Sequence, residues 1–184
     1  MLCLNDIICY ARKFANRFME DNNMIITFDK LPANLEELKA MPQATLSEPE
    51  YGAALFVAVM MHYSVNKDET FEMLDFLNGP YEVTEFQKQF IADRMAEGDH
   101  VVRSFFNGTS PDNDYTPSMP YTIETERGFD QEIDGRMRIL IASSGADSKR
   151  FVTMRHKPST NQWFLEDQML LSQIRTPKSQ DPWA

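Results

Sequence analysis

The chain has 184 residues, of which 42% are hydrophobic and 25% charged, and its formal net charge is −10. This length fits one domain whose core needs no disulfide or metal to hold it together. An acidic surface repels phosphate backbones and anionic lipid headgroups, so we expect binding to neither nucleic acid nor a membrane.

The only two cysteines, Cys3 and Cys9, lie six residues apart at the start of the chain. On a helix this spacing puts them on different faces, so neither a local disulfide nor a shared metal is expected. The start of the chain has no basic, signal-like segment, and the longest apolar run, residues 51–61, is too short to cross a bilayer. We therefore expect a cytoplasmic protein with no cofactor.

Residues 1–30 are predicted to form an extension made of an amphipathic helix and a short strand. Apolar residues recur at helical spacing from Leu4 to Phe18, and Arg12, Lys13 and Arg17 fall on the opposite side. Such a helix can dock on its own domain, pair with a second copy or attach to a partner, and docking on its own domain is the simplest of these. Residues 24–28, Met-Ile-Ile-Thr-Phe, indicate the strand.

Residues 31–184 are predicted to form a single α+β domain that is helical in its first half. The expected helix N-caps are Asn34, Ser47, Asn66 and Thr84, and the last three have Glu or Gln three residues later, as in a capping box. Residues 51–63 are apolar on nearly every side, which predicts the central helix of the core. The last helix carries its apolar pattern on Phe86, Phe90, Ile91 and Met95. With the N-terminal helix, about five helices are expected.

Residues 104–120 contain three prolines and predict a long, largely extended connection. Phe105, Phe106 and Tyr115 are expected to pin it to the body of the domain. An ordered connection of this length often borders a functional surface.

Strand patterns follow at residues 121–126, 136–142, 150–156 and 162–166. Short loops between the last three favour antiparallel neighbours. Leu170, Leu171 and Ile174 are expected to pack the tail on the sheet, and Trp183 is expected to tie down the terminus. The predicted fold is α+β, with N-terminal helices packed on a C-terminal antiparallel sheet of three to four strands.

Candidate ligand-binding residues gather in the second half of the chain: Tyr115, Tyr121, Ser144, Asp147, Arg150, Arg155 and His156. The loop at 143–150 concentrates hydroxyls, a carboxylate and two cations, which suits an anion or a polar substrate. Ser144 and His156 lack the Gly-x-Ser-x-Gly pattern of a hydrolase, and a structural hairpin turn explains the same loop. No catalytic residue is assigned.

The three histidines fall in no metal-binding spacing. His100 follows Asp99 near the expected end of a helix, a position that favours an imidazolium. Carboxylates between Asp68 and Glu85 are expected on solvated helix faces rather than in an acid–base site.

Several motifs resemble a family of uncharacterised bacterial proteins known only as a domain of unknown function. They include Leu31-Pro32, residues 76–80 (Phe-Leu-Asn-Gly-Pro), residues 115–121, residues 143–148, Gln162-Trp-Phe-Leu165 and the closing Asp-Pro-Trp-Ala. The resemblance spans Leu31 to Ala184 and implies an intracellular bacterial protein, but it brings no known activity or cofactor. A weaker, fold-level likeness is to NTF2-like and cystatin-like domains, which often end in a strand carrying Trp, as Trp163 does here.

The functional expectation is a non-enzymatic binding or protein-interaction module. Residues 31–100 hold 4 Lys/Arg against 13 Asp/Glu, and such an acidic helical face suits a basic protein partner. The alternative is a small-ligand-binding or hydrolytic domain with a pocket between sheet and helices. The sequence leaves the oligomeric state open.

Overall fold

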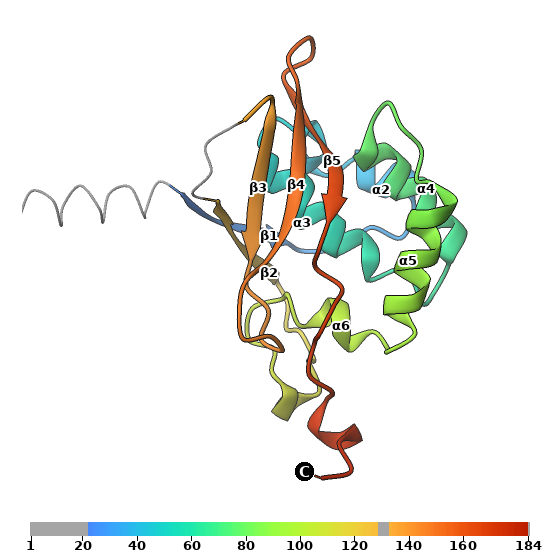
Figure 1. Ribbon diagram of the computed structural model, residues 1–184, viewed down its shortest axis with the longest axis vertical. Coiled ribbons are helices and arrows are strands. Elements are labelled where there is room, and N and C mark those ends of the chain that lie inside the picture. Colours follow the sequence, from blue (N-terminus) through green and yellow to red (C-terminus); the bar gives the residue numbers. More distant parts are fainter. Residues whose placement is uncertain (1–21, 129–132, 184) are drawn as a thin grey trace, which may run out of the picture.

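The computed structural model describes residues 22–128 and 133–183. Five antiparallel strands form one sheet in the order β1-β2-β3-β4-β5, and the helices cover one of its faces (Figure 1). The strands are β1 Asn23–Phe28, β2 Tyr121–Arg127, β3 Arg136–Ile141, β4 Arg150–Lys157 and β5 Gln162–Gln168. The helices are α2 Leu35–Lys39, α3 Pro49–Met60, α4 Lys67–Asn78, α5 Glu85–Met95 and α6 His100–Arg103.

The α+β class is confirmed, but the predicted count of three to four strands and the order of helices before sheet are wrong. β1 precedes every described helix and pairs with β2, with Ile26 opposite Ile123. Ile26 and Phe28 alternate with exposed residues and point into the core. The pairing joins residues about a hundred positions apart, so no local pattern could reveal that the first strand belongs to this sheet. The predicted N-terminal helix lies outside the described residues.

Helix α3 forms the middle of the core, as its apolar sequence predicts. Every residue from Gly52 to Met60 is buried, and the helix packs against all five strands on one side and α4 on the other. Figure 1 shows the resulting layers, with the sheet on one side, α3 in the middle and α4 with α5 beyond it. Helix α3 thus fills the space between the sheet and the outer helices.

Helix N-caps follow the sequence at three of four positions. The side chains of Asn34 and Asn66 accept backbone N–H bonds at the starts of α2 and α4, and Thr84 forms a complete capping box with Gln87. The cap expected at Ser47 is wrong, since α3 begins at Pro49 after Glu48 without a side-chain cap. Proline at the first helical position needs no N–H partner and already has helical φ, which makes the cap dispensable.

A buried ion pair joins the start of α3 to the end of β2. Glu50 is 2% exposed and accepts two bonds from the guanidinium of Arg127, which also contacts Glu48. These carboxylates raise the pKa of Arg127 above its ordinary value. The pair joins the start of the helix to the end of the strand.

The long connection and the tail pack largely as predicted. Phe105, Phe106 and Tyr115 are buried, and so are Leu170, Leu171 and Ile174. Trp183, however, is 93% exposed, so the prediction that it ties down the terminus is wrong. Polar contacts of residues that precede Trp183 hold the tail instead: Lys178 Nζ lies 3.0 Å from Asp112 Oδ1, and the Ser179 N–H donates to Asp114.

Candidate functional site

An apolar groove lies between helix α5 and the edge strand β5, and it is named here the α5–β5 groove. It consists of two adjoining hollows of about 230 and 500 Å³. Both hollows are bordered by Asn78, Gln87, Leu165 and Glu166. The first extends between α4, α5 and β5, and the second reaches the α4–α5 loop and the β4–β5 hairpin.

Local sequence signals hold α5 at this place. Gly79 ends α4 with φ +73°, and its backbone lies against the ring of Phe164 on β5. Only glycine tolerates both the left-handed backbone and this close approach. The Val83 N–H then donates to Asp75 Oδ1 over 2.6 Å, and the Thr84 capping box starts the helix. The loop therefore fixes where α5 begins relative to β5.

Helix α5 carries two apolar stripes, and only one of them is buried. Ile91 and Met95, four residues apart, pack into the core. Phe86 and Phe90, also four residues apart, line the first hollow, and Phe86 is 81% exposed. Residues four apart lie above one another on a helix, so the second stripe forms a continuous apolar wall.

Strand β5 forms the opposite wall, and its outer edge is only partly covered. The Trp163 N–H donates to the Leu46 carbonyl over 2.8 Å, and Gln162 Nε2 donates to the Thr45 carbonyl. A bulge interrupts the β4–β5 register between Thr153 and Met154. Beyond the covered start of the strand, Leu165 and Met169 face the first hollow.

Two charged groups that line the groove, Glu166 and Arg155, are bound to each other. Glu166 accepts two bonds from Arg136, at 2.6 and 2.9 Å, and one from Arg155 at 2.8 Å. The Arg136 guanidinium is the main reason that the pKa of Glu166 is lowered. His156 stacks on Trp163 with 4.6 Å between ring centroids, and its Nε2 lies 3.1 Å from Asn161 Oδ1.

The two helices nearest the groove, α4 and α5, are acidic overall. Between Lys67 and Met95, on α4, α5 and their loop, seven Asp or Glu residues stand against three Lys or Arg. Lys88 pairs with Glu85, and Arg94 lies over the Phe90 ring. A basic segment would therefore be attracted to this side of the molecule.

The structure divides the seven candidate ligand-binding residues between the two ends of β4. Arg155 and His156 line the second hollow of the groove. Ser144, Asp147 and Arg150 lie at the opposite end of that strand, where the chain enters it from β3 (Figure 1). Ligand binding at these seven residues stays a prediction.

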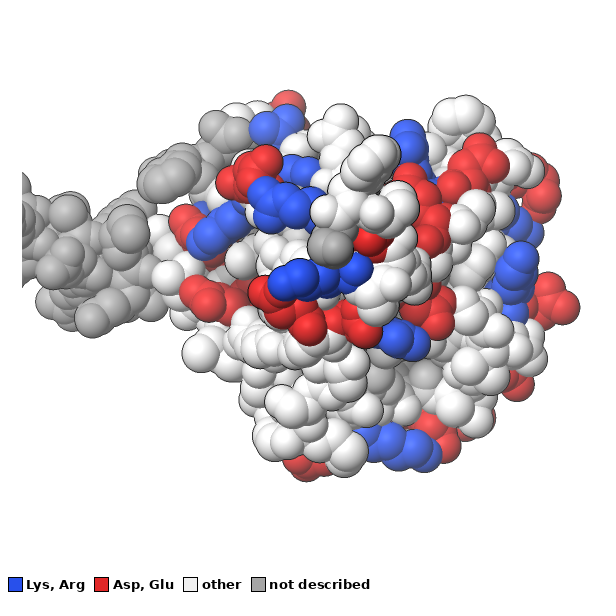
Figure 2. Space-filling view, turned by 90° about the horizontal axis from the view of Figure 1, so that it is seen from below, with Lys and Arg blue, Asp and Glu red and all other residues white. Residues whose placement is uncertain are grey.

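At the opposite end, the candidate side chains contact the chain itself. Tyr115 is fully buried and donates its hydroxyl hydrogen to the Arg175 carbonyl, whereas Tyr121 packs edge-on against Phe106. Ser144 Oγ donates to the Ser104 carbonyl, and Asp147 pairs with Arg175. Figure 2 looks onto this end and shows basic and acidic side chains interspersed rather than one charged field.

Arg150 and His100 complete this end of the molecule. Arg150 donates to Ser148 and to the Ser172 carbonyl, which links β4 to the tail. His100 is buried beside the Tyr115 ring, and burial lowers its pKa. The expected imidazolium is therefore wrong: His100 starts α6 rather than ending a helix, and desolvation outweighs the nearby carboxylates.

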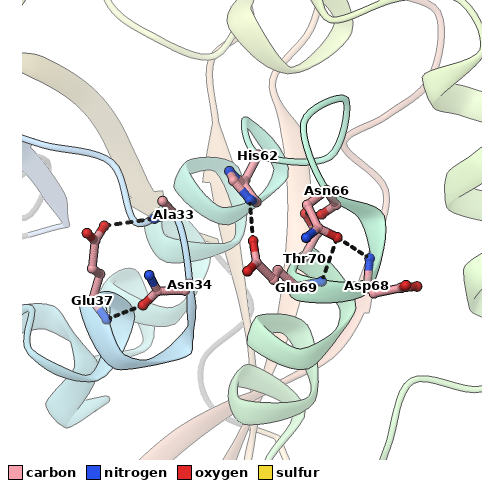
Figure 3. A network of polar contacts seen from close by, with 8 residues as sticks. All are labelled: Ala33, Asn34, Glu37, His62, Asn66, Asp68, Glu69 and Thr70. Atoms are coloured by element: carbon pink, nitrogen blue, oxygen red, sulfur yellow. Dashed lines mark hydrogen bonds and ion pairs between the residues drawn. The ribbon is translucent and has the colours of Figure 1, made fainter.

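A second group of polar residues, shown in Figure 3, serves the helix starts. Asn34 Oδ1 accepts the Glu37 N–H, and Asn66 Oδ1 accepts the N–H groups of Asp68 and Glu69. His62 Nε2 lies 2.9 Å from Glu69 Oε2. The two asparagine side chains are therefore helix caps, and the His62–Glu69 contact joins the segment after α3 to α4. Within residues 22–128 and 133–183, no three His, Cys, Asp or Glu side chains are grouped so that they could hold a metal.

The residues that define the groove were not predicted from the sequence. Phe86 and Phe90 were expected on the apolar face of a helix, and no role was predicted for Tyr81 or Met169. The available signal was the doubling of the i, i+4 pattern on α5, but a helix that is apolar on more than one side can also be buried, as α3 is. No helix of the described part is long and apolar enough to span a membrane.

Comparison with known proteins gives one match. A family model described as "Domain of unknown function (DUF6935)" matches residues 30–178, which confirms the resemblance to a domain of unknown function. No curated protein and no solved structure matches the chain, so the likeness to NTF2-like and cystatin-like folds is not confirmed.

Proposed function

The chain belongs to the family described as Domain of unknown function (DUF6935), and from that premise we propose that it is a non-enzymatic protein-interaction module. Its α5–β5 groove binds an apolar segment of a protein partner, and basic residues of that segment meet the acidic surroundings. The motif resemblance implies a bacterial, cytoplasmic setting for this role.

The concentration of exposed apolar side chains in the groove carries this proposal. Eight large hydrophobic residues are exposed among those the structure describes, and three of them line the groove: Tyr81, Phe86 and Met169. Isolated exposed apolar residues are ordinary, but a contiguous apolar surface marks a place where something binds. Aromatic side chains and Met are also enriched in the buried centres of protein interfaces.

The alternative, a small-ligand site between sheet and helices, has one observation in its favour. The first hollow is lined by the apolar side chains of Phe56, Leu74 and Leu165 as well as by α5. At about 230 Å³ it falls below the roughly 300–1,000 Å³ of typical ligand pockets, whereas the adjoining second hollow, at about 500 Å³, lies within that range. Among the described residues, no Lys or Arg lines the first hollow, and Arg155, which lines the second, is bound to Glu166.

A hydrolytic role has less support. Ser144 precedes the start of β4 and His156 lies near its end, so roughly 20 Å of strand separates a nucleophile from its base. The Ser144 hydroxyl is engaged with Ser104 and Thr109. A general base has to reach the nucleophile within hydrogen-bond distance.

Selection of peptides from a random display library on the full chain tests the proposal. We expect enriched peptides with apolar residues at helical or alternating spacing and with flanking Lys or Arg. Their binding should be lost on Phe86→Asp/Phe90→Asp and kept on Ile25→Asp, because Ile25 is exposed on β1, at the other edge of the sheet. Equal binding to the groove variant, or no enrichment, would contradict it.

A further inference from the structure

We propose that the occupant of the α5–β5 groove is the N-terminal segment, residues 1–21, of a second copy of this chain. The inference rests on the proposed function, because it names the partner of the same groove. The apolar pattern of the segment, its charge and its length each bear on the proposal.

The segment offers apolar side chains that could cover the exposed apolar side chains of the groove. Its apolar positions recur at helical spacing: Leu4, Ile7, Ile8, Ala11, Phe14, Ala15 and Phe18. As a helix, residues 4–18 would be about 22 Å long. The groove is elongated, since its two hollows adjoin and share lining residues. Phe14 and Phe18 would pack on the stripe of Phe86 and Phe90, as one helix packs on another.

The charges of the two surfaces are complementary. Residues 7–18 contain Arg12, Lys13 and Arg17 and no Asp or Glu. Helices α4 and α5 and their loop carry seven carboxylates against three cations, and one of these carboxylates, Glu82, lines the second hollow. A basic segment is attracted to this acidic side of the molecule, which favours its association with the groove.

The length of the chain assigns the segment to a second copy. β1 and β5 are the two edges of the sheet, so four strand spacings of about 4.8 Å put them about 19 Å apart. Helix α5, which forms the other wall of the groove, lies farther from β1 than β5 does (Figure 1). The five residue steps from Phe18 to Asn23 span at most about 18 Å. Phe18 therefore does not reach the groove of its own chain, and in a helix Phe14 lies only about 6 Å beyond Phe18.

Reciprocal exchange gives a closed dimer. Each copy offers one segment and one groove, and a two-fold axis satisfies both at once without leaving an open surface for further growth. The assembly is thereby limited to two copies.

The test measures molar mass by size-exclusion chromatography with light scattering on the full chain and its variants. The wild type is expected to be a dimer that dissociates on dilution. The segment variant Phe14→Asp/Phe18→Asp and the groove variant Phe86→Asp/Phe90→Asp are each expected to be monomers with unchanged circular dichroism. Ile25→Asp, an equally apolar exposed position outside the groove, should remain a dimer.

Mixing the two monomeric variants identifies the contact. The segment variant keeps an intact groove and the groove variant keeps an intact segment, so the mixture should form a heterodimer held by one of the two contacts. A monomeric wild type, a dimer that survives either variant, or a mixture that stays monomeric overturns the proposal. If self-association fails while selected peptides still require Phe86, another protein occupies the groove and the interaction module stands.

Discussion

Phe86 and Phe90 lie one turn apart on α5 and give the groove its apolar wall. A solvent-facing Phe contributes nothing to folding through burial, and about 1.5–3 kcal/mol is gained only when such a side chain leaves water. At the residue scale, the stripe is therefore a surface that gains free energy when a partner covers it.

Gly79 is the residue on which the position of α5 depends, and Gly79→Ala should destabilise the fold. A Cβ there would come within 2.4 Å of the Phe164 ring at a φ of +73°. Strain and overlap together should cost roughly 2–4 kcal/mol in the free energy of unfolding. Gly108→Ala is the matched control, because φ is +80° but nothing lies within 4 Å. It should cost only about 1 kcal/mol. Equal losses in urea denaturation would refute the contact with Phe164.

His100 should make stability depend on pH in a defined direction. Burial lowers its pKa below the ordinary 6.5, and the smaller influences of Glu97 and Arg103 oppose each other. The unfolded chain therefore takes up a proton near pH 6.5, whereas the folded chain does so only at lower pH. The stability present above pH 6.5 is lost as the pH falls below it.

Denaturant unfolding at a series of pH values from 7.5 to 5 checks this expectation. The free energy of unfolding of the wild type should fall relative to His100→Asn over that range. Because burial rather than a charged neighbour is the main cause, the difference should persist in 0.5 M NaCl. The expectation fails if wild type and variant show parallel pH profiles.

At the scale of elements, the start of α5 depends on its cap and the start of α3 does not. Thr84→Ala removes a complete capping box and should cost about 1 kcal/mol. Ser47→Ala tests the cap that the sequence predicted and the structure lacks. The Ser47 hydroxyl lies 3.3 Å from that of Thr45 and caps no backbone N–H of α3, so the change should stay within about 0.5 kcal/mol. Urea denaturation of both variants compares them, and a larger loss at Ser47 would restore the predicted capping box.

The outer edge of strand β5 is covered at its start and open farther along. Its first residues bond to the segment before α3 through Trp163 and Gln162, and covering an edge in this way hinders pairing with other chains. Farther along, α5 stands beside the strand and leaves the groove between them. One part of the edge of β5 is thus blocked from pairing with other chains, and another part borders the groove where we propose that a partner binds.

At the scale of the whole molecule, β1 contributes two side chains to the core. Ile26 and Phe28 are almost completely buried, and removing two such side chains costs roughly 4–8 kcal/mol. A chain that starts at Leu31 should therefore melt at least about 10 °C below one that starts at Asn22. Thermal unfolding followed by circular dichroism gives the comparison. Similar melting temperatures would show that residues 31–184 fold without β1, as the sequence predicted.

Local signals in the sequence determined most elements of the fold. Asn34, Asn66 and Thr84 mark helix starts because a side-chain cap needs only the next three residues. The buried α3 and the four strands after Tyr121 follow from hydrophobic periodicity alone. The seven candidate site residues were chosen by chemical type, a criterion that carries no information about their distances from one another.

The tertiary structure decided what the sequence left open: that β1 closes the far edge of the sheet, and that Phe86 faces a groove rather than the core. Both depend on contacts between residues far apart in the chain. Ile26 pairs with Ile123, and α5 faces a strand that follows it by some seventy residues. An apolar residue has the same sequence pattern whether its neighbours cover it or not, and only the packed chain determines which stripe of α5 remains for a partner.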